Sequence, residues 1–271
     1  MPTHRATLNG TEYAYTDEGA GPLIVFGHGL LASKEMFAAQ IAALRYRYRC
    51  VSVDWPGHGE SGYDSEGWTF YDLAEDTVAL LEHLGEEKAI FAGLSQGGMV
   101  FMRMAVKHPE VVDRLILLDT SAGPEPVESL PAYEQLAQGM HDGDDATREQ
   151  LAGLVTTILY GEPWRERDPD GVAHEIALML SHDRDGLFLA CRAVFDRDDV
   201  LDQVYEIEAP TLVIVGELDG ATTPDRAREL DGAIPNSRLI VIPDAGHHSP
   251  IENPEPVTRA IDEFLTATAT A

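Results

Sequence analysis

Short apolar runs alternate with helix-length segments along most of this 271-residue chain. The apolar runs have the length of buried strands, and each ends at glycine or a polar residue: PLIVFGHG, CVSVDWPG, AIFAGLS, RLILLDT, TLVIVGELDG and RLIVIPDAGH. Segments such as 70–84 and 96–108 lie between them and have the length of helices. Strand, helix and strand in succession predict an α/β fold with a mostly parallel, doubly wound sheet. Active sites of such sheets gather at the carboxyl ends of the strands.

The alternation is modified at two places. Asn9 and Gly10 separate two β-like runs, which predicts an antiparallel hairpin near the amino terminus. From about 121 to 208 the sequence has helical patterns, such as TREQLAGLVTTILY and GVAHEIALMLS, and no convincing strand. We expect residues 1–120 and 209–271 to form one α/β core, and residues 121–208 to form a helical cap inserted over the strand ends. The carboxyl-terminal TATATA is expected to be a frayed tail.

The composition favours one acidic, globular enzyme domain. Hydrophobic residues make up 44% of the chain, which is enough for one sizeable core. The formal net charge of −28 argues against nucleic acid and anionic membranes as partners, and it indicates either a solvated acidic surface or adaptation to high salt. No apolar run of membrane-spanning length occurs, and the amino terminus lacks the apolar stretch of a signal peptide. A cytoplasmic location is therefore expected.

The sulfur-containing residues indicate packing rather than metal binding or disulfides. Two cysteines, Cys50 and Cys191, are too few for a disulfide framework and lie in apolar-flanked segments, so we expect buried free thiols. Met99, Met102 and Met104 fall in the helix-like run after residue 95 and are expected to lie in the core or to line a pocket. No metal-ligand spacing is evident, and no metal site is predicted.

The stretch FAGLSQGGMV places Ser95 among glycines, directly after a strand-like run and before a helix-like one. Gly93-Leu94-Ser95-Gln96-Gly97 matches G-x-S-x-G in the strand–turn–helix context that gives this motif its meaning. The turn is so tight that the residues two before and two after the serine must be small, and Ser95 is expected to be strained with its hydroxyl exposed. A Gly-rich phosphate loop and a plain strand-to-helix turn are the alternatives, but a dinucleotide-binding loop needs G-x-G-x-x-G, and Ser95 occupies the position of its second glycine.

A serine hydroxyl is a weak nucleophile and needs a histidine base that is oriented by a buried carboxylate. In proteins with this tight strand–serine–helix turn, called a nucleophile elbow, the acid and then the histidine follow the serine along the chain. Asp219 and His247 each lie just past a strand-like run downstream of Ser95, and we expect them to complete a catalytic triad. Glu217 and Asp244 are rivals for the acid, but Glu217 comes earlier in the same turn and Asp244 lies in the connection to the histidine.

Two backbone N–H groups are candidates for an oxyanion hole. Gln96 opens the helix after the serine, so its N–H points at an oxyanion forming beside Ser95. The second donor should come from the loop after the early strand, where His28-Gly29-Leu30 offers the N–H of Leu30. We expect the His28 side chain to be structural, and in the later segment DWPGHGESG we expect His58 to brace neighbouring loops.

With these motifs in order, the chain resembles the α/β-hydrolase superfamily along nearly its whole length. The matching motifs are H-G at 28–29, D-x-P-G-x-G-x-S at 54–61, G-x-S-x-G at 93–97, G-x-x-D-x-x-T-P at 216–224 with one extra residue, and G-H-x-x-x-x-E-x-P at 246–254. The resemblance implies a serine hydrolase with Ser95, Asp219 and His247 as the triad. It is greatest to carboxylesterases, 3-oxoadipate enol-lactonases and cofactor-free haloperoxidases or perhydrolases. Dehalogenases and epoxide hydrolases carry aspartate in place of Ser95, which argues against them.

The resemblance also leaves two residue choices to be weighed. Some members of the superfamily carry the acid after the strand RLILLDT, which makes Asp119 a rival of Asp219. The segment DAGHHSPIENP offers both His247 and His248 as the base. In the family pattern the catalytic histidine directly follows glycine and precedes glutamate by five residues, which favours His247 with Glu252.

The expected activity is hydrolysis of a small or medium carboxylic ester or lactone through an acyl-enzyme, with a small-molecule partner and no cofactor. The cap is expected to select the substrate. Candidates for lining the substrate pocket are Leu31, Met99, Trp164, Phe188 and Phe195. For Trp164, Phe188 and Phe195 the alternative is that they only pack between the helices of the cap. A ligand receptor that retains the triad for slow or single turnover is a different hypothesis. A protein-interaction scaffold is a third, which an intact triad disfavours.

Overall fold

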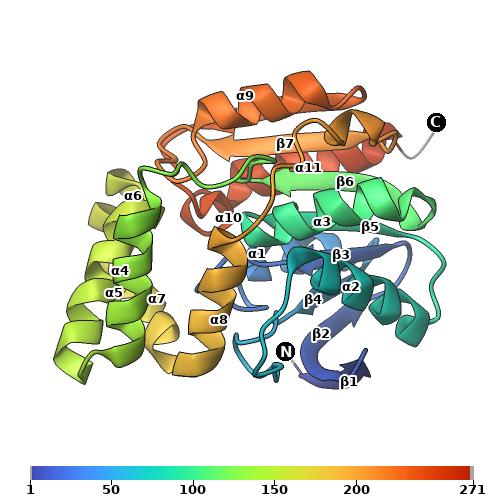
Figure 1. The fold of residues 1–271 in the computed structure, drawn as a ribbon. Coiled ribbons are helices and arrows are strands. Elements are labelled where there is room, and N and C mark those ends of the chain that lie inside the picture. The colour runs from blue at the N-terminus through green and yellow to red at the C-terminus, as the bar shows by residue number, and fades with distance from the viewer. Residues whose placement is uncertain (1, 269–271) are drawn as a thin grey trace.

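The computed structural model describes residues 2–268, and an eight-stranded sheet runs through it (Figure 1). The strands are β1 (His4–Leu8), β2 (Thr11–Gly19), β3 (Leu23–Gly27), β4 (Arg49–Val53), β5 (Ala89–Leu94), β6 (Val112–Leu118), β7 (Thr211–Gly216) and β8 (Ser237–Ile242). Their order across the sheet is β1-β2-β4-β3-β5-β6-β7-β8. All neighbouring pairs from β4 to β8 are parallel, and only the pairs β1·β2 and β2·β4 are antiparallel. The predicted architecture is confirmed.

The antiparallel part begins with the predicted hairpin. Leu8 pairs with Thr11, which leaves Asn9 and Gly10 as the two-residue loop. Both loop residues have positive φ angles, 46° and 100°. This is the backbone of a type I′ turn, which Asn-Gly adopts at little cost and which matches the twist of the strands.

Helices cover both faces of the sheet because alternate strand residues point to opposite faces. Leu23 and Val25 of β3 pack in one apolar cluster with α2 (Phe70–Leu84), α3 (Gln96–Lys107) and α9 (Pro224–Ala233). Ile24 and Phe26 pack in another with α1 (Ala38–Leu44) and α11 (Pro254–Thr268), next to the short α10 (Ser249–Glu252). Helix α2 has the predicted bounds, because a Thr69–Asp72 capping box starts it and Gly85, with φ 73°, ends it.

Five helices lie between β6 and β7, where the sequence predicts no strand. They are α4 (Leu130–Asp142), α5 (Asp145–Leu159), α6 (Glu162–Arg167), α7 (Pro169–Ser181) and α8 (Arg184–Phe195). Figure 1 shows them side by side next to the carboxyl ends of β6 and β7. We call residues 121–208 the helical insertion. Part of it has a small apolar cluster of its own around Met140, Val155 and Met179.

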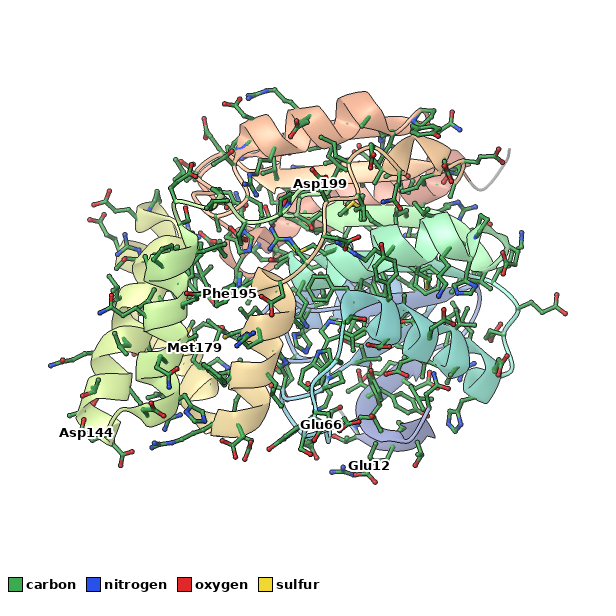
Figure 2. All side chains as sticks on the ribbon, viewed as in Figure 1. Glu12, Glu66, Asp144, Met179, Phe195 and Asp199 are labelled. Carbon is green, nitrogen blue, oxygen red and sulfur yellow. The ribbon has the colours of Figure 1, made fainter. Side chains whose placement is uncertain are left out.

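Other expectations concern the surface and the chain end. Acidic side chains such as Glu12, Glu66 and Asp144 are exposed and project outward (Figure 2). Cys50 and Cys191 are buried free thiols, as predicted. The expected frayed tail is wrong for 266–268, which belong to α11, and its remaining residues lie outside the described part of the chain. Among the helices of residues 2–268, none combines the length and apolar character that crossing a membrane requires.

Candidate active site

The turn between β5 and α3 holds Ser95 in a strained conformation. Ser95 has φ 50° and ψ −113°, an arrangement that non-glycine residues rarely adopt. A Cβ atom at Gly93 would overlap the backbone of Gly97, and one at Gly97 would overlap the backbone of Gly27. The glycines that surround the serine are therefore required by close backbone packing, and they allow the turn to lift Ser95 above the strand end.

Two loops at the same edge of the sheet bring a carboxylate and an imidazole together. Asp219 follows β7 and His247 follows β8, and the His247 Nδ1 atom lies 2.9 Å from Asp219 Oδ2. The other carboxylate oxygen accepts hydrogen bonds from the N–H groups of Ala221 (2.8 Å) and Thr222 (2.9 Å). The Thr222 hydroxyl donates to Asp219 Oδ2 at 2.8 Å. These contacts fix the carboxylate against the histidine.

The charges of this pair reinforce each other. Burial alone would lower the pKa of His247, but the nearby Asp219 carboxylate and its hydrogen bond raise that pKa above the ordinary value. Burial alone would raise the pKa of Asp219, but His247 and the hydrogen bonds from Thr222 lower it below the ordinary value. Asp219 is therefore suited to stay ionised and to stabilise a proton on His247.

The rival carboxylates are placed differently. Asp119 directly follows β6 and has φ 44°, and its oxygens accept from the Gly216 N–H (2.7 Å) and the Ser249 hydroxyl (2.5 Å). Burial, followed by the charge of Asp219, raises the pKa of Asp119 well above its usual range. Glu217 and Asp244 are exposed. Among the described residues, Asp219 is the only carboxylate that forms a hydrogen bond with His247.

The neighbouring histidine has another partner. His248 Nδ1 lies 2.6 Å from the hydroxyl oxygen of Tyr160, which donates its own proton to Glu175 at 2.7 Å. Burial lowers the pKa of His248 well below the usual value. His248 does not line the cavity that contains Ser95 and His247.

The two expected oxyanion donors have no internal acceptors. Leu30 lies in the loop after β3, and Gln96 is the first residue of α3. Within residues 2–268, neither backbone N–H donates a hydrogen bond to the protein. Free donors next to Ser95 are what an oxyanion site requires. In the same loops, His28 and His58 bond only to backbone groups, as expected of structural histidines.

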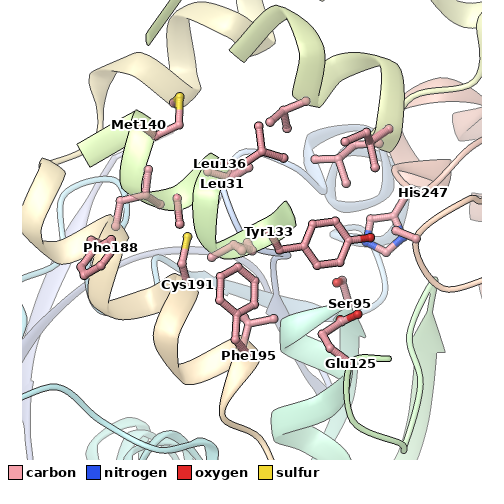
Figure 3. A pocket seen from close by; sticks show the side chains of 18 of the residues that line it. Leu31, Ser95, Glu125, Tyr133, Leu136, Met140, Phe188, Cys191, Phe195 and His247 are labelled. Atoms are coloured by element: carbon pink, nitrogen blue, oxygen red, sulfur yellow. The ribbon is translucent and has the colours of Figure 1, made fainter. Parts of the chain in front are cut away.

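A cavity of about 140 Å³ opens between the helical insertion and the strand ends. Figure 3 shows Ser95 and His247 on one side of it and Phe188 and Met140 on the other. Most of the wall is apolar. It includes Leu30, Leu31, Met99, Leu136, Met140, Val155, Leu159, Leu187, Phe188, Cys191 and Phe195.

Four of the five pocket candidates, Leu31, Met99, Phe188 and Phe195, thus lie on this wall. Trp164 does not line the cavity and instead has the alternative, packing role, since it is buried within the insertion and stacks on Tyr160 with ring centroids 4.8 Å apart. Conversely, Tyr133 and Glu125 line the cavity beside Ser95 but were not predicted (Figure 3). The helical pattern of the insertion shows that one face is apolar, but it does not show which cavity that face borders.

Over residues 2–268, no three His, Cys, Asp or Glu side chains are grouped so that they could hold a metal ion. The described residues of the site supply a hydroxyl, an imidazole, a carboxylate and two free N–H donors.

Comparisons with known proteins agree with this architecture. A family model described as the alpha/beta hydrolase fold matches residues 22–254. The 3-oxoadipate enol-lactonase 2 of Acinetobacter baylyi is 29% identical over 262 residues, which cover 93% of this chain and 92% of that protein. A thermophilic esterase from Thermogutta terrifontis, solved with malate bound, has a TM-score of 0.91 at 30% identity and 99% coverage of both chains. The enol-lactonase from Burkholderia xenovorans LB400 has a TM-score of 0.89 at 32% identity, covering 97% of this chain and 100% of that one. This chain belongs to the α/β-hydrolase family.

Proposed function

We propose that this protein is a serine hydrolase that cleaves a small or medium carboxylic ester or lactone through an acyl-enzyme. The observation that carries the proposal is the 2.9 Å contact between His247 Nδ1 and Asp219 in the cavity that also contains Ser95. Because Nδ1 is occupied by Asp219, the imidazole has Nε2 left to accept a proton. A buried carboxylate, a histidine and a strained serine form the combination used for acyl transfer.

The reaction follows in two halves. His247 takes the Ser95 proton as the hydroxyl oxygen attacks the substrate carbonyl, and Asp219 stabilises the resulting imidazolium. The N–H groups of Leu30 and Gln96 bind the oxyanion of the tetrahedral intermediate. His247 then protonates the leaving alcohol, which leaves an ester between the acyl group and Ser95. Water, deprotonated by His247, attacks that ester to give a second tetrahedral intermediate. This intermediate collapses to release the acid, and His247 returns the proton to the Ser95 oxygen.

The lining of the cavity favours a substrate with a largely apolar acyl group. The wall away from Ser95 is made by side chains such as Phe188, Met140 and Cys191 (Figure 3). Burying a methylene group there contributes about 0.8 kcal/mol. We propose that residues 121–208 act as a cap that supplies this wall and selects the acyl group.

Lactone hydrolysis is the second candidate, and the enol-lactonases among the similar proteins favour it. The same triad would open a lactone ring, with the alcohol staying attached to the acyl product. A perhydrolase or haloperoxidase activity would use the same groups, and a putative non-heme bromoperoxidase of Mycobacterium tuberculosis is 28% identical over 273 residues.

The test combines covalent labelling with turnover. A fluorophosphonate probe should label Ser95 stoichiometrically, and a panel of p-nitrophenyl esters and lactones should give multiple turnovers. Ser95→Ala should abolish both results, whereas Ser65→Ala, at an exposed serine, should leave both intact. Labelling at another residue would overturn the serine-hydrolase proposal. Labelling of Ser95 with no more than one turnover on every substrate would indicate the ligand-receptor hypothesis instead.

A further inference from the structure

Three histidines hold three consecutive peptide units in the loop that carries the Leu30 N–H. The carbonyl of Gly29 accepts a hydrogen bond from His28 Nδ1 at 2.7 Å. The N–H of Leu31 donates to His58 Nε2 at 3.2 Å. The carbonyl of Leu31 accepts from His182 Nε2 at 3.1 Å. Because each peptide unit is planar, holding one of its polar groups also sets the direction of the other.

The hydrogen bond at the other nitrogen of each ring determines which neutral tautomer that histidine adopts. His28 Nε2 accepts from the Trp55 N–H at 3.0 Å, and His182 Nδ1 accepts from the Gly59 N–H at 3.1 Å. His58 Nδ1 bonds to the carbonyl of Pro56 at 3.1 Å. A ring nitrogen that accepts from an N–H must be unprotonated. Burial lowers the pKa of all three histidines, that of His28 to about 3, so the neutral forms are favoured.

The three rings also contact one another in series. The centroids of His28 and His58 are 4.9 Å apart, and those of His58 and His182 are 5.2 Å apart. His28 and His58 come from the core. His182 comes from the helical insertion, between α7 and α8, yet it is 95% buried against the core loops.

The peptide unit that His182 holds follows a strained residue. Leu31 has φ 70°, which is unfavourable for a residue with a Cβ atom, and its side chain lines the cavity. Such a conformation persists only where surrounding contacts enforce it. His58 enforces it at the Leu31 N–H and His182 enforces it at the Leu31 carbonyl. Without the second contact, Leu31 could relax toward negative φ and turn the Leu30–Leu31 peptide unit, which would shift the neighbouring Gly29–Leu30 unit that carries the Leu30 N–H and that His28 also holds.

We propose that His182 is a positioning residue of the oxyanion site, through which the helical insertion holds the Leu30 N–H toward Ser95. This inference rests on the proposed function. It assigns to the insertion a role in transition-state stabilisation in addition to substrate selection. His182 touches neither the substrate nor Ser95, and it acts only through the backbone of Leu31.

Two substitutions separate the Leu31 contact from the Gly59 contact. A glutamine amide reaches about as far as imidazole Nε2, so His182→Gln can still donate to the Leu31 carbonyl. An asparagine amide reaches about as far as Nδ1, so His182→Asn can satisfy only the Gly59 N–H. His182→Ala removes both contacts, and His174→Ala, at an exposed histidine of α7, is the matched control.

The kinetic readout uses p-nitrophenyl butyrate and a trifluoromethyl ketone, whose adduct with Ser95 carries an oxyanion. His182→Ala and His182→Asn should lower kcat by roughly 10- to 100-fold, less than loss of a whole oxyanion donor, with KM changed by less than about threefold. The inhibition constant of the ketone should rise by the same factor as kcat/KM falls. His182→Gln and His174→Ala should stay within about threefold of the unmodified enzyme.

Amide hydrogen exchange gives a readout that does not depend on turnover. In the peptide spanning residues 28–34, exchange should accelerate in His182→Ala and His182→Asn but not in His182→Gln or His174→Ala. Unchanged exchange and unchanged kcat in His182→Asn would overturn the inference, as would a glutamine variant that is as impaired as the alanine variant. If the unmodified protein shows neither labelling nor turnover, the proposed function fails, and the exchange comparison still decides whether His182 holds the loop.

Discussion

His248 and Tyr160 form a 2.6 Å hydrogen bond that joins the histidine loop to the helical insertion. The backbone strengthens this junction, because the His247 N–H donates to the Leu159 carbonyl at 2.9 Å. The Gly161 N–H also donates to Glu252 at 2.8 Å. The adjacent histidines therefore have different roles. His247 faces Asp219 and the cavity, and His248 anchors the loop to the helical insertion.

We expect substitution of these two histidines to affect different properties. His247→Ala should lower kcat by roughly three to six orders of magnitude, because the proposed base is lost. His248→Ala should change kcat by less than about tenfold. It should instead lower Tm by several degrees, because the Tyr160 hydroxyl loses a buried hydrogen-bond partner. Steady-state kinetics and thermal melts of both variants check this, and an inactive His248→Ala beside an active His247→Ala contradicts the assignment.

The second prediction compares the two carboxylates near His247. Asp219→Asn should lower kcat by about four orders of magnitude, because the imidazole loses the partner that sets its tautomer. Asp119→Asn should lower kcat much less, since Asp119 bonds to Gly216 and Ser249 instead. Both variants are measured on one p-nitrophenyl ester. A ranking in the opposite order would move the acid to Asp119.

The pH dependence follows from the raised pKa of His247. Only the neutral imidazole accepts the Ser95 proton, so kcat/KM should be low in acid and rise with pH. Because Asp219 raises the pKa of His247, the midpoint should lie above the reference value of about 6.5, where an isolated histidine would place it. In Asp219→Asn the effect of burial remains without the carboxylate, so the midpoint of the residual activity should move to lower pH. A midpoint that stays fixed in this variant would show that another group titrates.

The fourth prediction concerns the Gln96 side chain, whose amide oxygen and nitrogen are both buried without a hydrogen-bond partner. Burying an unsatisfied polar group costs about 1–3 kcal/mol. Gln96→Met should remove this cost and raise Tm, by about 2–4 °C for each kcal/mol regained. Gln40→Met is the control for a half-satisfied amide: the Gln40 amide oxygen also lacks a partner, but its nitrogen donates to the Pro250 carbonyl at 3.2 Å and the Thr258 hydroxyl at 3.3 Å, so this substitution should lower Tm. Calorimetry of both variants checks the difference, and equal shifts would contradict it.

The fifth prediction tests the apolar wall of the cavity. Cys191 lies on α8 between Phe188 and Phe195, and all three line the cavity (Figure 3). Cys191→Phe should fill space there and lower kcat/KM for a p-nitrophenyl hexanoate by about tenfold or more relative to the acetate. Leu189→Phe, at a residue of α8 that does not line the cavity, should leave the ratio between the two esters unchanged. An unchanged ratio in Cys191→Phe would place the acyl group elsewhere.

Local sequence patterns were sufficient to predict the sheet and the tight turn at Ser95. The Asn9-Gly10 turn, the bounds of α2 and the glycines around Ser95 each depend on backbone conformations that a few neighbouring residues determine. The parallel order also follows, because short strands joined by helices have few ways to pack. The expectation that Ser95, Asp219 and His247 gather at one edge needed only this order and the position of each residue after its strand.

The tertiary structure decided which residues of the helical insertion face the site. Trp164 packs on Tyr160, whereas Tyr133 and Glu125 line the cavity. His182 reaches the backbone of Leu31, 151 positions earlier in the chain. An amphipathic pattern identifies the apolar face of a helix, but the direction of that face depends on how helices distant in sequence pack together. Contacts of this kind are absent from any local window of the sequence, and they exist only once the insertion is folded against the core.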